Sequence, residues 1–334
     1  MHSYFNTFLF FALMAAVQTI AYPSASSLYN PDSPSKGRHH RANDIAFLEG
    51  LTNNDQDMSG REGDDPEKYF HESIFHAHYD GRFAYQTLPD KTRLPHLRAL
   101  VRSYLATMHD LGAETWIMHG SLLGWWWNQR IMPWDDDIDV QVSEPAIEFL
   151  ASYHNMTVHS FAASDLDISD PDEVELMHSG KRYLLEVNPH YANPSTDDWQ
   201  NVIDARWIDI DTGLFIDITT VRVNRTAEGT MGRPKGSAYR YPEPPQHLYC
   251  KDEHTFWSTQ IFPLRTAVFE GVPVRIPYKY QELLAEEYGE SALTEREFLV
   301  EKHFFDQAKM ERKTSKRGSI SPSFHLRNFL KRGY

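Results

Sequence analysis

The run Pro133-Trp134-Asp135-Asp136-Asp137-Ile138-Asp139-Val140 holds four carboxylates within five positions. On a strand, side chains at positions i and i+2 share one face, so Asp137 and Asp139 project together, with Asp135 beside them and Asp136 pointing away. Carboxylates this close repel one another, and keeping them ionised costs free energy unless a cation lies between them. Oxygen ligands without a neighbouring His or Cys in the run favour Mg²⁺, Mn²⁺ or Ca²⁺ over zinc. We therefore predict metal ligands at Asp135, Asp137 and Asp139. A solvated acidic turn is the alternative, and the apolar residues around the run argue against it.

A second acidic position follows in the apolar stretch Phe215-Ile216-Asp217-Ile218-Thr219. A single buried carboxylate on such a strand is costly unless it pairs with a cation, so Asp217 is predicted as a further ligand. The set suits in-line displacement at phosphorus, in which two Mn²⁺ or Mg²⁺ ions activate a hydroxyl and neutralise the leaving phosphate. Asp137 and Asp139 are then expected to bridge the ions, with Asp217 on the ion nearest the nucleophile. The role of Asp135, ligand or orienting group, stays open.

Residues that bind a phosphate are expected just before the acidic run. Gly120 and Ser121 follow a predicted strand and precede a helix over Leu122–Trp127, so their backbone N–H groups can cradle a phosphate. His119 is the histidine predicted to contact a donor phosphate.

Three consecutive tryptophans and two arginines have two interpretations each. Trp126 and its neighbours Trp125 and Trp127 either stack on a nucleobase or sugar or belong to the core, and at least one of the three is expected in the core. Arg130 and Arg206 are candidates to clamp a diphosphate, and a surface ion pair is the ordinary alternative.

These residues require a scaffold of alternating helices and strands. Apolar periodicity predicts helices over Leu94–Leu111, Ala146–Tyr153 and Tyr280–Tyr288, with Gly112 and Gly289 as stops. Ser143 is predicted to cap the second of these helices. Strands are predicted at Thr115–Met118, Ile138–Val142, Trp207–Ile210, Leu214–Val221 and, as a hairpin or edge strand, Phe269–Ile276. Without regular βαβ spacing, this pattern predicts an α+β fold with a mixed β-sheet flanked by helices.

Composition narrows the class of protein. The 334 residues carry 33 Lys+Arg and 47 Asp+Glu, a formal charge of −14, which argues against a general nucleic-acid binder. With 41% hydrophobic residues and eight Trp, the chain is predicted to be globular. Cys250 is the only cysteine, so an intramolecular disulfide and a cysteine-based zinc cluster are excluded.

The ends of the chain predict a compartment. Residues 1–21 contain the apolar run Phe5–Val17, typical of a secretory signal peptide or an uncleaved anchor. Residues 22–65 are predicted to form a flexible stem, residues 66–310 the folded domain and residues 311–334 a basic tail. The body is thus expected in the Golgi lumen, as a type II membrane-anchored protein, or secreted. The sequons at Asn155 and Asn224 fit that compartment.

The stretch His119–Gly124, continued by Ile131–Val140, resembles the LicD family, which includes phosphocholine transferases and the fukutin-type transferases. The resemblance covers about residues 66 to 300 and implies a nucleotidyltransferase-like fold and transfer of a phospho-group from a nucleotide donor to a glycan hydroxyl. The segments His76–Phe83 and Asn201–Trp207 are similar to the fungal mannosylphosphorylation branch. That branch implies GDP-mannose as donor, release of GMP and a mannosyl-phosphate diester on a cell-wall or protein-linked glycan.

Two alternatives remain. The best known fungal member of the family has also been viewed as a regulator, so the first is a non-catalytic subunit of a partner transferase in the Golgi. The second is an ordinary glycosyltransferase, whose D-x-D motif also holds Mn²⁺ against a nucleoside diphosphate.

Overall fold

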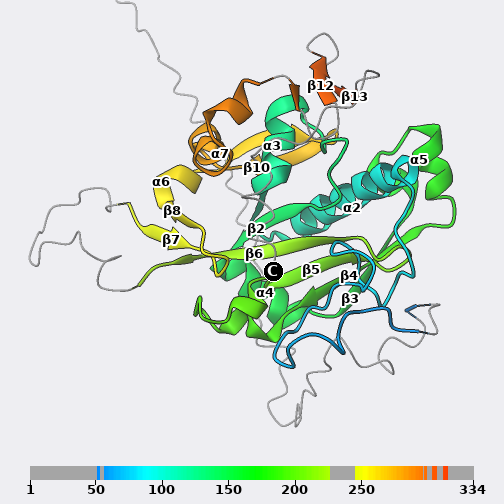
Figure 1. The fold of residues 1–334 in the computed structure, drawn as a ribbon, viewed down its shortest axis with the longest axis horizontal. Coiled ribbons are helices and arrows are strands. Elements are labelled where there is room, and N and C mark those ends of the chain that lie inside the picture. Colours follow the sequence, from blue (N-terminus) through cyan, green and yellow to red (C-terminus); the bar gives the residue numbers. More distant parts are fainter. Residues whose placement is uncertain are drawn as a thin grey trace, which may run out of the picture. The chain divides into compact units, whose positions relative to one another are not determined.

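A computed structural model describes residues 51–52, 56–225 and 245–295, together with the backbone of 297–298, 303–306 and 311–314 (Figure 1). The predicted signal segment, most of the predicted stem and most of the basic tail lie outside these residues. The predicted domain bounds therefore stay a prediction.

One mixed sheet of eight strands forms the centre of the fold, with strand order β1-β2-β6-β5-β4-β3. β7 pairs with the end of β6, and β8 pairs with β7. Among the described strands of this sheet, β2 and β6 are the one parallel pair. The strands are β1 Thr115–Ile117, β2 Asp139–Ser143, β3 Thr157–Phe161, β4 Lys181–Val187, β5 Ala205–Asp209, β6 Phe215–Val223, β7 His247–Tyr249 and β8 Thr255–Trp257. The predicted α+β fold with a mixed sheet is confirmed.

Helices and short accessory sheets surround this sheet (Figure 1). The α-helices are α2 Asp90–Leu111, α3 His119–Asn128, α4 Glu144–Tyr153, α5 Pro171–Leu176, α6 Ser258–Ile261 and α7 Tyr280–Tyr288. Four 3₁₀ turns are described: η2 Ala163–Leu166, η3 Pro189–Ala192, η4 Trp199–Asn201 and η5 Glu290–Leu293. A hairpin joins β9 Arg265–Phe269 to β10 Val272–Ile276, and a small sheet contains β11 Glu297–Phe298, β12 His303–Asp306 and β13 Glu311–Thr314.

The start of α2 and the cap of α4 differ from the predictions. α2 begins at Asp90, before the predicted start, and includes Pro95. It ends where predicted, because Gly112 adopts φ 69° and its N–H bonds back to the carbonyls of Met108 and His109. Ser143 occupies the N-cap position of α4, but its side chain forms no capping hydrogen bond, so that prediction was wrong.

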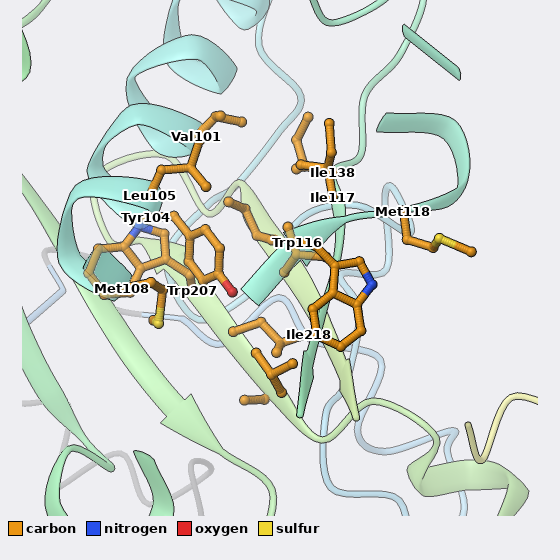
Figure 2. Packing of buried hydrophobic residues seen from close by; sticks show 14 of the residues in the cluster. Val101, Tyr104, Leu105, Met108, Trp116, Ile117, Met118, Ile138, Trp207 and Ile218 are labelled. Atoms are coloured by element: carbon orange, nitrogen blue, oxygen red, sulfur yellow. The ribbon is translucent and has the colours of Figure 1, made fainter. Parts of the chain in front are cut away.

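One face of the sheet is apolar and packs against α2. Figure 2 shows Val101, Tyr104, Leu105 and Met108 of α2 close to Trp207 and Ile218 of the sheet. The Tyr104 hydroxyl also lies 2.7 Å from Thr115 Oγ1, so this buried phenol keeps a polar partner at the edge strand. The core thus packs α2 against β1, β5 and β6.

The opposite face carries the polar residues of the site and is covered by the segment of residues 56–85. Phe83 packs against Leu184, Ile208 and Phe215 of the sheet. The buried Arg82 donates to Glu186 Oε2 over 2.7 Å. A backbone hydrogen bond from the N–H of Met58 to the carbonyl of Gly81 joins the start of this segment to its end.

None of the described helices is long and apolar enough to cross a membrane.

Candidate functional site

The structure brings together four carboxylates, which we call the carboxylate cluster: Asp135, Asp137, Asp139 and Asp217. Asp139 opens β2 and lies directly opposite Asp217 in the parallel pairing of β2 with β6. Opposite residues of neighbouring strands project from the same face, so these two side chains converge. Asp135 and Asp137 lie in the segment that leads from α3 into β2. The ligand roles predicted for all four remain a prediction.

Burial and mutual repulsion raise the pKa values of carboxylates in this cluster. Burial, followed by the carboxylates of Asp137 and Asp217, raises the pKa of Asp139 well above its usual range. The pKa of Asp135 is also raised well above its usual range, by burial and then by Asp137 and Asp136. Neither Asp135 nor Asp139 forms an ion pair with any residue that the structure describes. Ionising Asp135 and Asp139 therefore costs free energy unless a cation from outside the described part of the protein neutralises them.

Asp137 keeps part of its side chain in solvent. Its side chain keeps 46% of its surface exposed, and its Oδ2 lies 3.6 Å from His78 Nδ1. Burial and the carboxylates of Asp136 and Asp217 raise its pKa, while His78 opposes that shift. A cation or a substrate can approach the cluster from this exposed side.

Asp217 has a permanent cationic partner. Arg206 Nε donates to Asp217 Oδ1 over 2.7 Å, and Arg206 Nη2 lies 3.1 Å from Glu72 Oε1. The guanidinium is buried and stacks on the rings of Phe215 and Phe70, 3.8 and 4.8 Å from their centroids. Arg206 thus lies beside the cluster, engaged by two carboxylates and two rings.

Arg130 lies elsewhere. It is exposed, and with Arg98 and Arg102 it contributes to the positive charge around Glu270. Its predicted role as a diphosphate clamp stays a prediction.

The residues predicted to cradle a phosphate form the first turn of α3 rather than a separate loop. N–H groups in a first helical turn have no carbonyl within the helix to donate to, so they are available to an anion. A methyl group placed on Gly120 would meet no protein atom within 4 Å, so the space beside its backbone is open. Ser121 is buried, and its Oγ accepts a hydrogen bond from the N–H of Asp139 over 3.1 Å. The helix start is thereby tied directly to the cluster.

The three tryptophans pack against the C-terminal helical region. Trp127 is buried and donates to the carbonyl of Ala292, so the prediction of at least one core tryptophan is confirmed. Trp126 is half-buried, donates to the carbonyl of Leu293 over 3.2 Å and packs on Tyr280.

Several polar neighbours of the site were missed by the sequence analysis. Asp136 lies 3.2 Å from both His76 Nε2 and His78 Nδ1, so imidazoles do stand beside the acidic run. Glu287 of α7 bonds His119 Nδ1 over 2.9 Å and is one of the carboxylates that raise the pKa of Asp139. No local pattern predicts that these residues lie beside the acidic run or beside one another, because they come from segments distant in the chain.

Possible ligands at the acidic run point to a divalent cation, because one ligand atom each of His78, Asp136 and Asp137 lies within 4.8 Å of the other two. The cluster offers several carboxylate oxygens in a partly buried setting. Asp135 and Asp139 have no cationic partner among the described residues, and the Asp137 side chain keeps 46% of its surface exposed. Carboxylate oxygens are ligands that suit Mg²⁺ or Mn²⁺. Together with a mixed sheet and an open helix start, this arrangement is consistent with the nucleotidyltransferase-like class of folds.

Comparison with known proteins agrees with this class. The family described as LicD/FKTN/FKRP, nucleotidyltransferase domain, matches residues 112–279, about half of the chain. The chain belongs to the LicD family. Membership indicates a phosphotransferase-like or a regulatory role.

Two curated relatives come from Saccharomyces cerevisiae. Mannosyltransferase regulator 4 is 32% identical over 123 residues, which is 37% of this chain and 9% of that protein. Mannosyltransferase regulator 14 is 32% identical over 131 residues, 39% of this chain and 13% of that protein. The matched parts of this chain thus correspond to a small fraction of either relative.

Proposed function

We propose that this protein transfers a phospho-sugar, mannose-1-phosphate from GDP-mannose, to a hydroxyl of a cell-wall or protein-linked glycan. The observation that carries the proposal is the carboxylate cluster, in which Asp139 and Asp217 face one another across two strands beside an open helix start. Family membership and the names of the two relatives support the reaction class and the mannose donor.

Each residue has a distinct part in this reaction. Asp135, Asp137, Asp139 and Asp217 would hold Mn²⁺ or Mg²⁺, which supplies charge neutralisation at the diphosphate and acidifies the acceptor hydroxyl when bound. The N–H groups of the first turn of α3, at Gly120 and Ser121, are oriented to receive the donor phosphate. Arg206 holds the Asp217 carboxylate in place through its Nε donor.

A proton must leave the attacking hydroxyl during the transfer. His78 would accept it at Nε2, because its Nδ1 faces the carboxylates of Asp136 and Asp137, 3.2 and 3.6 Å away, and carries the ring proton. The glycan oxygen would form a bond to the β-phosphorus of GDP-mannose, the phosphorus that carries the mannose. The bond from this phosphorus to the oxygen that bridges it to the α-phosphorus would break, and GMP would leave with that oxygen. The product diester keeps the mannose and its phosphate.

We assign the reaction to the secretory pathway, in the Golgi lumen or outside the cell. The support is the apolar segment at residues 5–17 and the exposed position of the Asn155 sequon.

A regulatory role is the second candidate, favoured by the names of both relatives. In that role, the chain would keep the fold and act on a partner transferase that binds the sugar donor.

Product analysis separates these candidates. The purified full chain is incubated with Mn²⁺, GDP-mannose and an oligomannose acceptor, and nucleotides are separated by chromatography. GMP release that disappears in the Asp137→Ala, Asp139→Ala double variant supports transfer at phosphorus. A matched control replaces two exposed carboxylates outside the site, Asp110→Ala and Glu114→Ala, and keeps wild-type turnover.

Two other outcomes would reject the proposal. Release of GDP in place of GMP would mean transfer of mannose alone by a glycosyltransferase. A folded wild-type chain that is inactive with all sugar nucleotides tested, but stimulates a partner transferase, would mean regulation.

A further inference from the structure

A second group of possible metal ligands lies beside the proposed catalytic cluster. His119, Asp252 and His254 each offer one ligand atom, and these atoms lie within 4.8 Å of one another. His119 opens α3, whereas Asp252 and His254 belong to the turn between β7 and β8. The sequence separates the two segments widely, so only the tertiary fold forms this group.

His119 is held in the tautomer that a metal ligand needs. Glu287 accepts from His119 Nδ1, with its two oxygens at 2.9 and 3.0 Å. With a proton on Nδ1, the other ring nitrogen, Nε2, carries the free lone pair. Metal-bound histidines typically use their second nitrogen in this way, donating to a carboxylate.

His119 Nε2 is also a buried atom with no hydrogen-bond partner among the described residues. A buried polar atom without a partner costs free energy, unless something absent from the protein chain binds it. A ligand that accepts this lone pair would remove the cost.

The other two residues complete the donor set. The Asp252 carboxylate lies 3.2 Å from His254 Nδ1, and the rings of His119 and His254 are 4.5 Å apart at their centroids. The backbone of the turn is closed by a hydrogen bond from Cys250 N–H to the carbonyl of His254. The turn therefore holds Asp252 and His254 toward the start of α3.

We propose that His119, Asp252 and His254 bind one Zn²⁺ ion, with Glu287 orienting His119 and water as the fourth ligand. Two imidazoles and one carboxylate favour zinc over Mg²⁺ or Ca²⁺, in contrast to the oxygen-only carboxylate cluster. Ligand atoms on one tetrahedral zinc lie roughly 3.3 Å apart, so the side chains must close in by up to about 1.5 Å.

The zinc ion joins the β7–β8 turn to the start of α3, with α7 held through Glu287. Ser121 in the same turn of α3 accepts from the N–H of Asp139, so the zinc fixes the helix start relative to the carboxylate cluster. Zinc binding at this site is independent of whether the cluster performs phosphoryl transfer.

Zinc titration of the full chain tests the proposal. The protein is stripped with a chelator, and Zn²⁺ binding is followed by calorimetry in an Asp137→Asn, Asp139→Asn background, which removes competing carboxylates. One zinc equivalent is expected to remain in that background, and His254→Ala is expected to weaken it by at least roughly 100-fold. Glu287→Gln is expected to weaken it by about 10- to 100-fold. Co²⁺ at the same site should give the visible absorption of a four-coordinate ion.

The matched control is His190→Ala, which removes another partly exposed histidine that pairs with an aspartate, at 3.0 Å from Asp198. It should leave zinc binding unchanged. Circular dichroism checks the fold of each variant, and Asp252→Asn replaces His254→Ala if the latter unfolds. Absence of zinc binding in the background variant, or unchanged affinity in a folded His254→Ala or Asp252→Asn chain, would overturn the proposal.

Discussion

Asp139 of β2 and Asp217 of β6 lie opposite one another in a parallel strand pair, and Arg206 binds the second of them. Asp217 therefore has two possible duties, as a metal ligand and as an anchor for a buried guanidinium. Asp139 has no such partner among the described residues, and its pKa is raised well above its usual range, by burial and then by the neighbouring carboxylates.

Replacing Asp217 by Asn separates the two duties. The variant should lose roughly 100-fold or more in turnover, because removal of orienting groups around a metal alone typically costs about 10- to 100-fold. Glu72→Gln is the matched control, since it weakens the other ion pair of Arg206 and leaves the cluster intact. Steady-state rates and melting temperatures are measured for both. Equal loss of activity in the two variants would mean that Asp217 acts only through Arg206.

Replacing Gly120 by Ala tests the phosphate cradle. The added methyl meets no protein atom within 4 Å, and Ala is a better helix former than Gly by about 1 kcal/mol, so the variant should fold normally. A donor phosphate that sits against this backbone would clash with the methyl. The KM for GDP-mannose should then rise by roughly tenfold, equivalent to about 1.4 kcal/mol. An unchanged KM would remove Gly120 from the donor site.

Replacing Asp139 by Asn should stabilise the metal-free protein while it abolishes activity. A carboxyl whose pKa is raised in the folded state makes the protein less stable as the pH rises. The loss begins at the pKa of the unfolded state, about 3.9, and continues through the pKa of the folded state. The gain from Asn should therefore be larger at about pH 8 than at about pH 4, where the unfolded chain is also half protonated. Thermal unfolding at both values measures this. Mn²⁺ should stabilise the wild type and not the variant, and a variant that melts lower than the metal-free wild type would contradict the account.

Asp209 gives the opposite pH dependence at the far end of β5. Burial works to raise its pKa, but Lys181 Nζ at 2.9 Å and His96 outweigh burial and lower the pKa to about 2. The stability from this pair is fully present above the unfolded pKa of about 3.9 and is lost as pH falls through about 2. Asp209→Asn should cost roughly 1 to 3 kcal/mol at neutral pH and much less near pH 2. A denaturant titration at each pH checks this, and a cost independent of pH would contradict it.

Much of the secondary structure follows from local pattern. The periodic apolar residues of α2 and α7 and the glycines that end these helices are properties of short stretches of chain. The acidic run and its spacing from Gly120 and Ser121 are equally local, which is why these residues could be grouped before any fold was known. The predicted helix begins at Leu122 whereas α3 begins at His119, because Gly and Ser are typical of loops and the local pattern therefore stops short of them.

The neighbours of these residues depended on tertiary structure. Strand order decides that Asp217 meets Asp139, since β6 inserts next to β2 across a long sequence separation. Packing of the segment 56–85 decides that Glu72 reaches Arg206 and that His78 reaches Asp137. The fold of the β7–β8 turn decides that Asp252 and His254 meet His119. Periodicity reports only which side of its own element a residue occupies, whereas sheet order and layer packing choose the element that it faces.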